Sequence, residues 1–419
     1  MHNTSTRRSR ALAAGFAALT AAVAFTGQAA AAPASEGYTK AQRSTVLEAG
    51  REDAARQLAM RANAAAAGPE TCRTTTAGEG VTMYRYAGLN RYETAVCASF
   101  WTWYDHVDTT PDVPKANAVV LARGDAFPDA LAGGPLAGYV NGPLLLTSPT
   151  TLLPSVKAEI QRVLKPGGTV YLLGGTGSLS SGVASSITSL GYTAKRLAGA
   201  DRYQTAIRIA QEMPTTNLFF VTTGTNFPDA LAAGTYSATA TLGATRDSNP
   251  DTKPVALLFS NNSSMPASTG NFIAARANEH GNFLLLMTAG GAAQTAATNA
   301  FGSNVVEPYT GRDRYETAAK IAEGLFTDGE NKLVGAGVGL ASGTNFPDAL
   351  AGTSMLMLYA QPLLLTNPTS LSSHTKVFLQ NHAGDVTDPE GNPDAFLDVL
   401  GGTGAVSSST ANAAMIAFS

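Results

Sequence analysis

Short apolar runs alternate with longer stretches of helical spacing over most of the 419-residue chain. Residues 118–122, 143–147 and 170–173 are apolar almost throughout, which is typical of strands covered on both faces of a parallel sheet. Between or after them, residues 155–164 and 178–190 have the length and polarity of helices. Strand and helix in alternation predict an α/β fold with mainly parallel sheets and crossover helices.

A short phrase recurs three times along the chain. It reads RYAGLNRYETA at 85–95, RLAGADRYQTA at 196–206 and YTGRDRYETA at 309–318. We call it the opening phrase; its glycines at positions 88, 199 and 311 give a period of 111 and then 112 residues. A catalytic group is needed once per chain, whereas a motif made in triplicate serves the architecture of each copy or a repetitive partner. The triplication therefore favours a binding protein over an enzyme.

Each opening phrase contains an Asn or Asp three positions before a Glu or Gln. The pairs are Asn90 and Glu93, Asp201 and Gln204, and Asp313 and Glu316. This is the Asx form of a capping box, in which the first side chain accepts from an early backbone N–H group and the second reaches back. A helix is expected to begin in each phrase.

A second phrase, Phe-Pro-Asp-Ala-Leu, follows in step at 127–131, 227–231 and 346–350. It leads into an Ala-, Gly- and Leu-rich helix without a polar face, which must be enclosed on all sides. The second repeat carries 11 additional residues after this phrase, polar around 246–253, and we expect them to form a surface loop.

A glycine-rich turn ends the repeats, as Gly-Gly-Thr-Gly at 174–177 and 401–404 and in a weaker form at 289–292. Two interpretations stand. Backbone N–H groups of such a turn can hold an anion, or the turn simply connects a strand tightly to a helix.

The N-terminal region differs from the repeats. Three arginines precede an apolar run at 11–25 and small residues at 29–32, so residues 1–32 are predicted to be a secretory signal peptide rather than a membrane anchor. We expect the mature protein to be secreted and to have no membrane span. Residues 33–80 form a leader or spacer, with a helix predicted by propensity between 38 and 67.

The net charge argues against one class of partner, and the cysteine content predicts a disulfide. Without the signal peptide the chain has 25 basic and 31 acidic residues, a net charge of about −6, and this balance lacks the basic footprint of a nucleic-acid-binding protein. Cys72 and Cys97 are the only cysteines. In an oxidising compartment a disulfide between them is favoured over two buried thiols.

The ordered motifs together resemble the type 2 cell wall-binding repeat family of Gram-positive bacteria. The matching patterns are G-x-[DN]-R-[YF]-x-T-A, F-P-D-A-L-A, P-[ILV]-L-L-T and L-G-G-T-G-x-[LIV]-S. They divide the chain into repeat 1 (81–191), repeat 2 (192–304) and repeat 3 (305–419). Repeat 2 is divergent, because its apolar strand and its glycine turn depart from the patterns.

The resemblance implies a fold and a function. It implies three Rossmann-like subdomains in a pseudo-threefold arrangement that anchor a secreted protein non-covalently to anionic cell-wall glycopolymer or peptidoglycan at the cell surface. It also implicates the P-[ILV]-L-L segments in binding. In this chain those residues are Pro143, Leu144, Leu145 and Leu146, and Pro362, Leu363, Leu364 and Leu365.

Charged residues of the repeated phrases are further candidates. The arginines are Arg91, Arg202 and Arg314, and the aspartates of the Phe-Pro-Asp phrases are Asp129, Asp229 and Asp348. The guanidinium groups could hold an anionic polymer. Alternatively, each arginine pairs with one of the aspartates as an internal tie between two helix starts, which is the interpretation we favour.

Cofactor and catalytic patterns are sparse. The sequence contains no H-E-x-x-H and no G-x-S-x-G motif, so we expect no catalytic residue and no resident cofactor. The acidic residues Asp385, Asp388, Glu390 and Asp394 have two interpretations, a site for a divalent cation such as calcium and a solvated acidic turn, and we favour the turn. The alternatives to anchoring are a peptidoglycan- or carbohydrate-active hydrolase and a self-assembling surface coat protein.

Overall fold

The computed structural model describes most of the repeat region and none of residues 1–70. The described residues are 71–110, 113–247, 253–281, 284–328, 330–333, 335–386 and 394–419. The predicted signal peptide and the predicted leader helix lie outside them.

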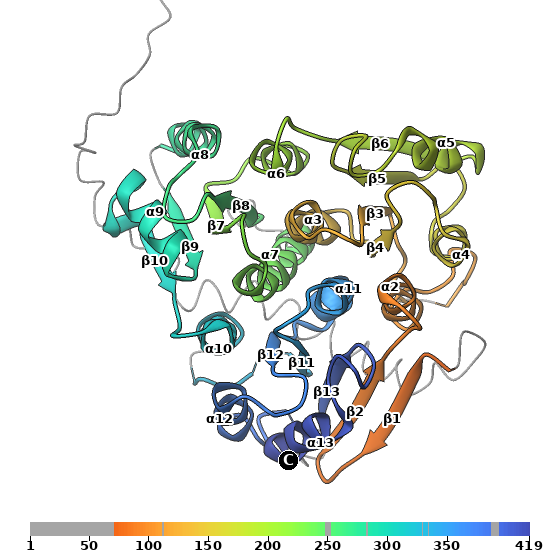
Figure 1. Cartoon of the computed structure of the whole chain (residues 1–419), viewed down its shortest axis with the longest axis vertical. Helices are drawn as coiled ribbons and strands as arrows, with labels where there is room; N and C mark the ends of the chain where they lie inside the picture. Colours follow the sequence, from red (N-terminus) through yellow and green to blue (C-terminus); the bar gives the residue numbers. More distant parts are fainter. Residues whose placement is uncertain are drawn as a thin grey trace, which may run out of the picture.

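Three separate sheets form the framework (Figure 1). The first has the order β4-β3-β5-β6, with strands β3 (Ala118–Arg123), β4 (Leu144–Thr147), β5 (Thr169–Leu173) and β6 (Thr193–Leu197). The second has the order β10-β9-β7-β8, with strands β7 (Leu218–Thr223), β8 (Ala256–Ser260), β9 (Leu285–Ala289) and β10 (Val306–Tyr309). Both are parallel throughout, as the unbroken apolar runs predicted.

The third sheet joins the two ends of the repeat region. Its order is β1-β2-β13-β11-β12, with strands β1 (Arg73–Ala77), β2 (Val81–Tyr86), β11 (Gly337–Ser342), β12 (Leu363–Thr366) and β13 (Ala395–Leu400). Strand β2 runs parallel to β13, and β1 is added antiparallel at the edge. The first opening phrase thus completes the sheet of the last repeat.

The same exchange of strands occurs at every repeat. Strand β6 leads into the second opening phrase but pairs with β5 of the first repeat, and β10 leads into the third phrase but pairs with β9 of the second. Each repeat therefore gives its first strand to the sheet of the preceding repeat. Repeat 1 gives its first strand, β2, to the sheet of repeat 3, so the three repeats close into a ring.

Helices begin in the opening phrases as predicted. They are α2 (Arg91–Phe100), α6 (Arg202–Ala210) and α10 (Arg314–Leu325). Their N-caps Asn90, Asp201 and Asp313 accept backbone N–H groups of the first turn. The Glu93 carboxylate reaches back to the N–H group of Leu89, at 3.1 Å. This group precedes the cap residue, so the box encloses one residue more than the standard form.

The helices that start with Phe-Pro-Asp occupy the centre of the molecule (Figure 1). They are α3 (Pro128–Tyr139), α7 (Pro228–Arg246) and α11 (Pro347–Leu356), and nearly all of their residues are buried. A methyl group on Gly138 of α3 would lie 2.3 Å from the carbonyl oxygen of Ala238 of α7, so glycine permits the two backbones to touch. The prediction of enclosed helices is confirmed.

We expected the insertion in repeat 2 to form a surface loop, but part of it is helical. Helix α7 has 19 residues where α3 has 12, so the additional residues first extend the helix to Arg246. Residues 248–252 lie outside the described part of the chain.

Three phenylalanines mark a pseudo-threefold axis where the central helices begin. The ring centroids of Phe127, Phe227 and Phe346 are 5.8, 5.8 and 5.5 Å apart, so each ring contacts both others. One phenylalanine comes from each repeat, and equal spacing requires that the repeats meet with equivalent geometry.

The remaining helices cover the outer faces of the sheets. They are α4 (Pro154–Val163), α5 (Ser181–Ser189), α8 (Ala267–Glu279), α9 (Gly291–Phe301), α12 (Ser373–Asn381) and α13 (Ser408–Phe418), with the short 3-10 turns η1 (Ser303–Val305) and η2 (Met357–Tyr359). In the part of the chain that the structure describes, no helix combines the length and apolarity needed to cross a membrane.

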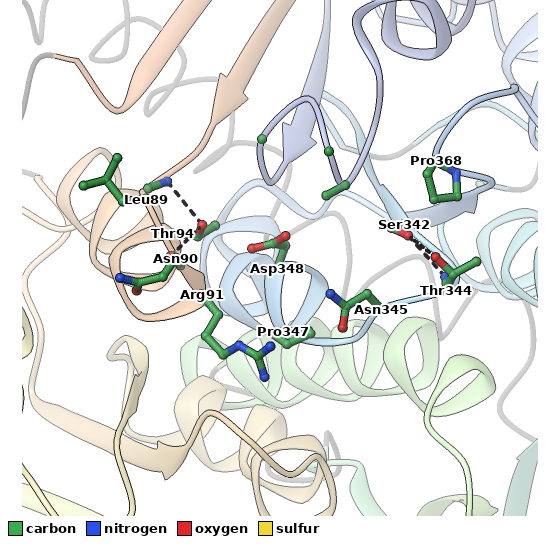
Figure 2. A pocket seen from close by; sticks show the side chains of 14 residues that line it. Leu89, Asn90, Arg91, Thr94, Ser342, Thr344, Asn345, Pro347, Asp348 and Pro368 are labelled. Carbon is green, nitrogen blue, oxygen red and sulfur yellow. Dashed lines mark hydrogen bonds between the residues drawn. The ribbon is translucent and has the colours of Figure 1, made fainter.

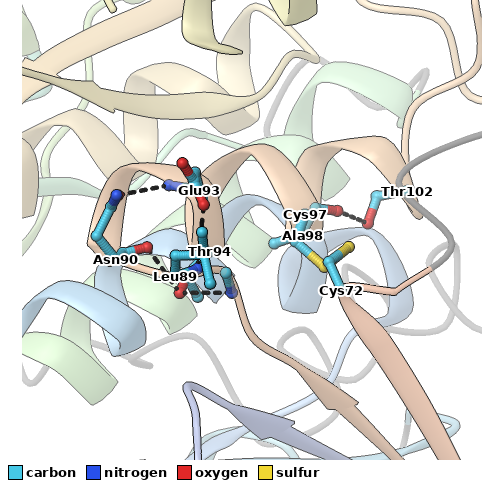
Figure 3. Close-up of a disulfide and its surroundings, with 9 residues drawn as sticks. Cys72, Leu89, Asn90, Glu93, Thr94, Cys97, Ala98 and Thr102 are labelled. Carbon is cyan, nitrogen blue, oxygen red and sulfur yellow. Dashed lines mark hydrogen bonds between the residues drawn. A yellow bond between two sulfur atoms is a disulfide. The ribbon is translucent and has the colours of Figure 1, made fainter.

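The predicted disulfide between Cys72 and Cys97 is present (Figure 3). Cys72 directly precedes β1, and Cys97 is a buried residue of α2. The bond therefore fixes the added edge strand to the helix of the first opening phrase.

Candidate functional site

The motif arginines hold glycine turns rather than carboxylates. Arg91 Nη1 donates to the carbonyl oxygen of Gly124 at 2.8 Å, and Arg314 Nη1 donates to that of Gly343 at 2.5 Å. Arg202 makes the same bond to Gly224. Within the described residues no ion pair joins these arginines to the aspartates of the Phe-Pro-Asp phrases, so the favoured internal tie is wrong as a direct pair. The carbonyl groups, which the sequence pattern does not reveal, take its place.

The tyrosine after each arginine explains the glycine. A methyl group on Gly124 would lie 2.4 Å from Cε1 of Tyr92, and one on Gly343 would lie 2.6 Å from Cε1 of Tyr315. The Arg-Tyr pair thus clamps the turn that precedes each Phe-Pro-Asp phrase, with one side chain bonded to its carbonyl and the other against its Cα.

The three aspartates occupy equivalent positions against the glycine-rich turns. A methyl group on Gly174 would lie 2.2 Å from Oδ2 of Asp129, and one on Gly401 would lie 2.4 Å from Oδ2 of Asp348. These glycines have φ values of 90° and 94°, in the left-handed region that favours glycine. The glycine-rich turns therefore make room for a carboxylate of their own repeat.

Burial raises the pKa of each of the three carboxyl groups above its ordinary value. For Asp348 the pKa rises through desolvation, against the opposing effects of a hydrogen bond from Thr94 and the charge of Arg91. For Asp229 the opposing groups are Thr317 and Arg314. In both cases they belong to the opening phrase of the next repeat around the ring.

We name each contact between an opening phrase and the preceding Phe-Pro-Asp segment a junction. Junction 1/2 joins the phrase of repeat 2 to Asp129, junction 2/3 joins that of repeat 3 to Asp229, and junction 3/1 joins that of repeat 1 to Asp348. Junction 3/1 closes the ring.

Junction 3/1 contains a pocket of about 470 Å³. Figure 2 shows Asn90, Arg91 and Thr94 of α2 on one side of it, with Asn345 and Asp348 at the start of α11 on the other. The rest of the lining consists of small or apolar residues: Gly88, Leu89, Ser342, Thr344, Pro347, Pro368, Gly402, Gly404 and Ala405. Its volume lies in the range of small-molecule sites.

Of the candidates predicted from sequence, the pocket unites Arg91 and Asp348. Arg202 with Asp129 and Arg314 with Asp229 occupy the other two junctions. Sequence reasoning missed the hydroxyl and amide groups of Thr344 and Asn345, which stand just before the Phe-Pro-Asp phrase. Their position directly before a repeated phrase is the sequence signal that could have identified them as site residues.

The two P-L-L-L segments have a different environment. They form the beginning and body of β4 and β12, and their six leucines are at most 1% exposed. These side chains are part of the core. Their role in binding stays a prediction, and it would act through the position of the strands rather than by contact.

The acidic residues considered for calcium are only partly described. Asp385 accepts hydrogen bonds from the backbone of Leu333 and from His382, while Asp388 and Glu390 lie outside the described residues. In the part of the chain that is described, no three His, Cys, Asp or Glu side chains are grouped as a metal site.

The fold and the site define the class of the protein. It is a ring of tandem α/β repeats whose polar sites lie between neighbouring repeats. Solved structures that share this fold include Cwp8 and Cwp6 from Clostridium difficile. Cwp8 superposes with a TM-score of 0.64 at 21% identity and covers 80% of this chain and 51% of its own. Cwp6 gives 0.63 at 22%, with 80% and 48%.

The family follows from the repeats. A family model described as cell wall binding domain 2 (CWB2) matches residues 85–184, 196–302 and 309–411. The chain belongs to this family of cell wall binding domains.

Two curated relatives contain a similar region within longer chains. N-acetylmuramoyl-L-alanine amidase LytC of Bacillus subtilis (strain 168) is 29% identical over 330 residues, 78% of this chain and 57% of the relative. The amidase enhancer of the same strain is 28% identical over 305 residues, 71% of this chain and 37% of the relative. The present chain thus spans about half or less of their length.

Proposed function

We propose that the three repeats anchor a secreted protein non-covalently to the cell wall by binding a wall glycopolymer at the junctions between repeats. The observation that carries this proposal is the pocket of junction 3/1. It combines an apolar rim with hydroxyl, amide and guanidinium groups in a protein of a wall-binding family. Sugars offer the complementary surfaces, since their C–H faces are apolar and their hydroxyl groups donate and accept hydrogen bonds.

The polymer is proposed to be anionic, as the repeat phrases suggested. The net charge of about −6 for residues 33–419 disfavours general electrostatic attraction, so recognition depends on local groups. Weak contacts at several points along a repetitive polymer add to a stable attachment. We propose no catalytic role for the repeats, because the carboxylates of the junctions hold the architecture together.

Sedimentation with isolated Gram-positive cell walls tests the proposal. The mature protein should sediment with intact walls and stay in solution with walls whose secondary polymers have been extracted by acid. Undiminished sedimentation after extraction would exclude the polymer as the ligand.

A variant that fills the pocket sharpens this test. Gly404 lines the pocket, and no atom lies within 4 Å of a Cβ placed on it, so Gly404→Trp introduces a large side chain at the pocket wall without a clash at its Cβ. We expect wall affinity to fall about tenfold or more, as for loss of a central contact. Ser185→Trp, on the exposed face of α5, is the matched control and should bind like the original protein.

A further inference from the structure

The three junctions share one backbone plan but differ in the side chains that face them. In all repeats, the last residue of strand β3, β7 or β11 is bonded to the residue two positions further along the chain. The pairs are Arg123 and Asp125 in repeat 1, Thr223 and Thr225 in repeat 2, and Ser342 and Thr344 in repeat 3. Ser342 and Thr344 line the pocket of junction 3/1, so their counterparts face the other two junctions.

In junction 1/2 an arginine crosses the equivalent space. Arg123 forms a two-pronged ion pair with Asp125, at 2.6 and 2.8 Å, and its Nη1 also donates to the carbonyl oxygen of Gly177 at 3.3 Å. Gly177 is the counterpart of Gly404, which lines the pocket in junction 3/1. The Arg123 side chain therefore connects the end of β3 to the glycine-rich turn. The corresponding segments of junction 3/1, the end of β11 and the turn at 401–404, have no such connection through Ser342.

In junction 2/3 side-chain hydrogen bonds to Asn262 and Gln294 take the same place. Thr225 donates to Oδ1 of Asn262 at 2.6 Å, and Asn262 is the counterpart of Pro368 of the pocket rim. Thr310 of the opening phrase donates to Oε1 of Gln294 at 3.0 Å. Gln294 lies on α9, which starts within the shortened glycine turn at Gly291.

In junction 3/1 Thr344 has the same side chain as Thr225, but Pro368 stands in place of Asn262 and offers no side-chain acceptor. Ser342 and Thr344 bond to each other at 2.9 Å and do not reach the glycine-rich turn. On that side the pocket is lined by residues with no side chain or only a methyl group, Gly402, Gly404 and Ala405. The rim is completed by Leu89, whose side chain is 95% exposed.

The charge of the pocket indicates what it holds. Its lining contains one cation, Arg91, and one carboxyl group, Asp348, whose charges balance. Arg91 already donates one Nη1 hydrogen to Gly124. The remaining polar side chains of the lining are hydroxyls and amides, which suit hydroxyl and acetamido groups better than a phosphate; they belong to Asn90, Thr94, Ser342, Thr344 and Asn345.

We infer that the three junctions are not equivalent, and that the ring-closing junction 3/1 is the subsite that captures the polymer through a neutral, hydroxyl- or acetamido-bearing sugar unit. This inference rests on the proposed function. The Arg123–Asp125 ion pair closes junction 1/2, and the anionic groups of the polymer lie outside the pocket. Residues from the two ends of the repeat region build this subsite, so it exists only in the closed ring.

Exchanging the paired residues between junctions tests the inference. The variant Ser342→Arg/Thr344→Asp transfers the ion pair of repeat 1 into junction 3/1, and we expect its affinity for intact walls to fall about tenfold or more. The variant Arg123→Ser/Asp125→Thr makes the reverse exchange and should retain the full affinity. Unfolding midpoints of both variants close to that of the original protein ensure that binding, not folding, is measured.

The possible outcomes separate this inference from the proposed function. Original protein that fails to sediment with walls overturns the proposed function itself. Wall binding by the original protein together with undiminished binding by Ser342→Arg/Thr344→Asp overturns only the assignment to junction 3/1. Loss of binding in Arg123→Ser/Asp125→Thr would place the subsite in junction 1/2. Competition by N-acetylglucosamine at millimolar concentration supports a neutral sugar, whereas competition by inorganic phosphate alone contradicts it.

Discussion

Arg85 donates a hydrogen bond from Nη1 to the carbonyl oxygen of Gly401 at 2.9 Å, although 316 positions separate the two residues in the sequence. Arg196 makes the equivalent bond to Gly174 in junction 1/2, also at 2.9 Å. Burial removes water from both guanidinium groups and thereby lowers their pKa. Each hydrogen bond must offset this desolvation. In junction 2/3, which has the shortened glycine turn, Pro308 occupies this position directly before the third opening phrase.

Replacing Arg85 should therefore loosen the closure of the ring. We expect Arg85→Ala to lower the free energy of unfolding by about 2 kcal/mol, the range for a hydrogen bond made by a charged donor. Because Gly401 adjoins the pocket-lining Gly402, wall binding should fall as well.

Arg196→Ala is the matched control for this prediction. It should cost a similar free energy in urea unfolding, since Arg196 bonds the carbonyls of Gly174 and Gly175. Its wall binding should be retained, because junction 3/1 is untouched. Equal losses of binding in the two variants would show that closure at this junction is not special.

The phenylalanine cluster on the axis should stabilise all three repeats together. Phe227 contacts the rings of both Phe127 and Phe346. Phe227→Ala removes two aromatic contacts and the apolar area of a half-buried ring, which together correspond to about 2 to 4 kcal/mol. Urea unfolding should show this loss, and Phe227→Leu should recover about half of it. An unchanged midpoint in the alanine variant would contradict a stabilising role of the axis.

The disulfide should stabilise the helix that carries one wall of the pocket. Cys72 and Cys97 are 25 positions apart, and closing a loop of this length contributes about 3 kcal/mol on the chain-entropy estimate. Cys72→Ala/Cys97→Ala should lower the unfolding free energy by that amount. Wall binding of the variant should weaken at temperatures where α2 separates from the ring. A reducing agent should lower the unfolding free energy and the wall binding of the original protein, and it should leave the variant unchanged.

Local features of this structure were predictable, and relations between distant segments were not. The caps at Asn90 and Asp201 and the enclosed helices α3 and α7 follow from short patterns, because capping and amphipathicity depend on neighbours in sequence. The exchange of opening strands between repeats does not. A period of 111 residues is the same whether β6 joins its own repeat or the preceding one.

The arginines illustrate the same limit within the site. Arg91 and Asp348 were both recognised as candidates, but their relation required knowledge of which repeat adjoins which. A backbone carbonyl has no sequence signature, so Gly124 as the partner of Arg91 was not predictable. The difference between junctions depends on Ser342 and Thr344, which are ordinary residues until Arg123 is seen to cross the corresponding space.

The pH dependence of stability should have opposite signs at two carboxyl groups. The pKa of Asp348 is raised by burial, so its protonated form favours the folded state. Its contribution is complete below the unfolded value of 3.8 and is lost as the pH rises through the higher folded value. Relative to the original protein, Asp348→Asn should therefore gain stability as the pH rises from 4 towards 7.

Glu316 provides the opposite case. Hydrogen bonds from the backbone and side chain of Arg312 lower its pKa to about 2. Its ionised form thus stabilises the protein above the unfolded value of 4.5, and this contribution is lost as the pH falls towards 2. Glu316→Gln should be less stable than the original protein at pH 7, and the difference should disappear in acid. Melting temperatures of both variants between pH 3 and pH 7 measure the two trends. Parallel trends would contradict the assignment, because a shared cause such as net charge would then govern both.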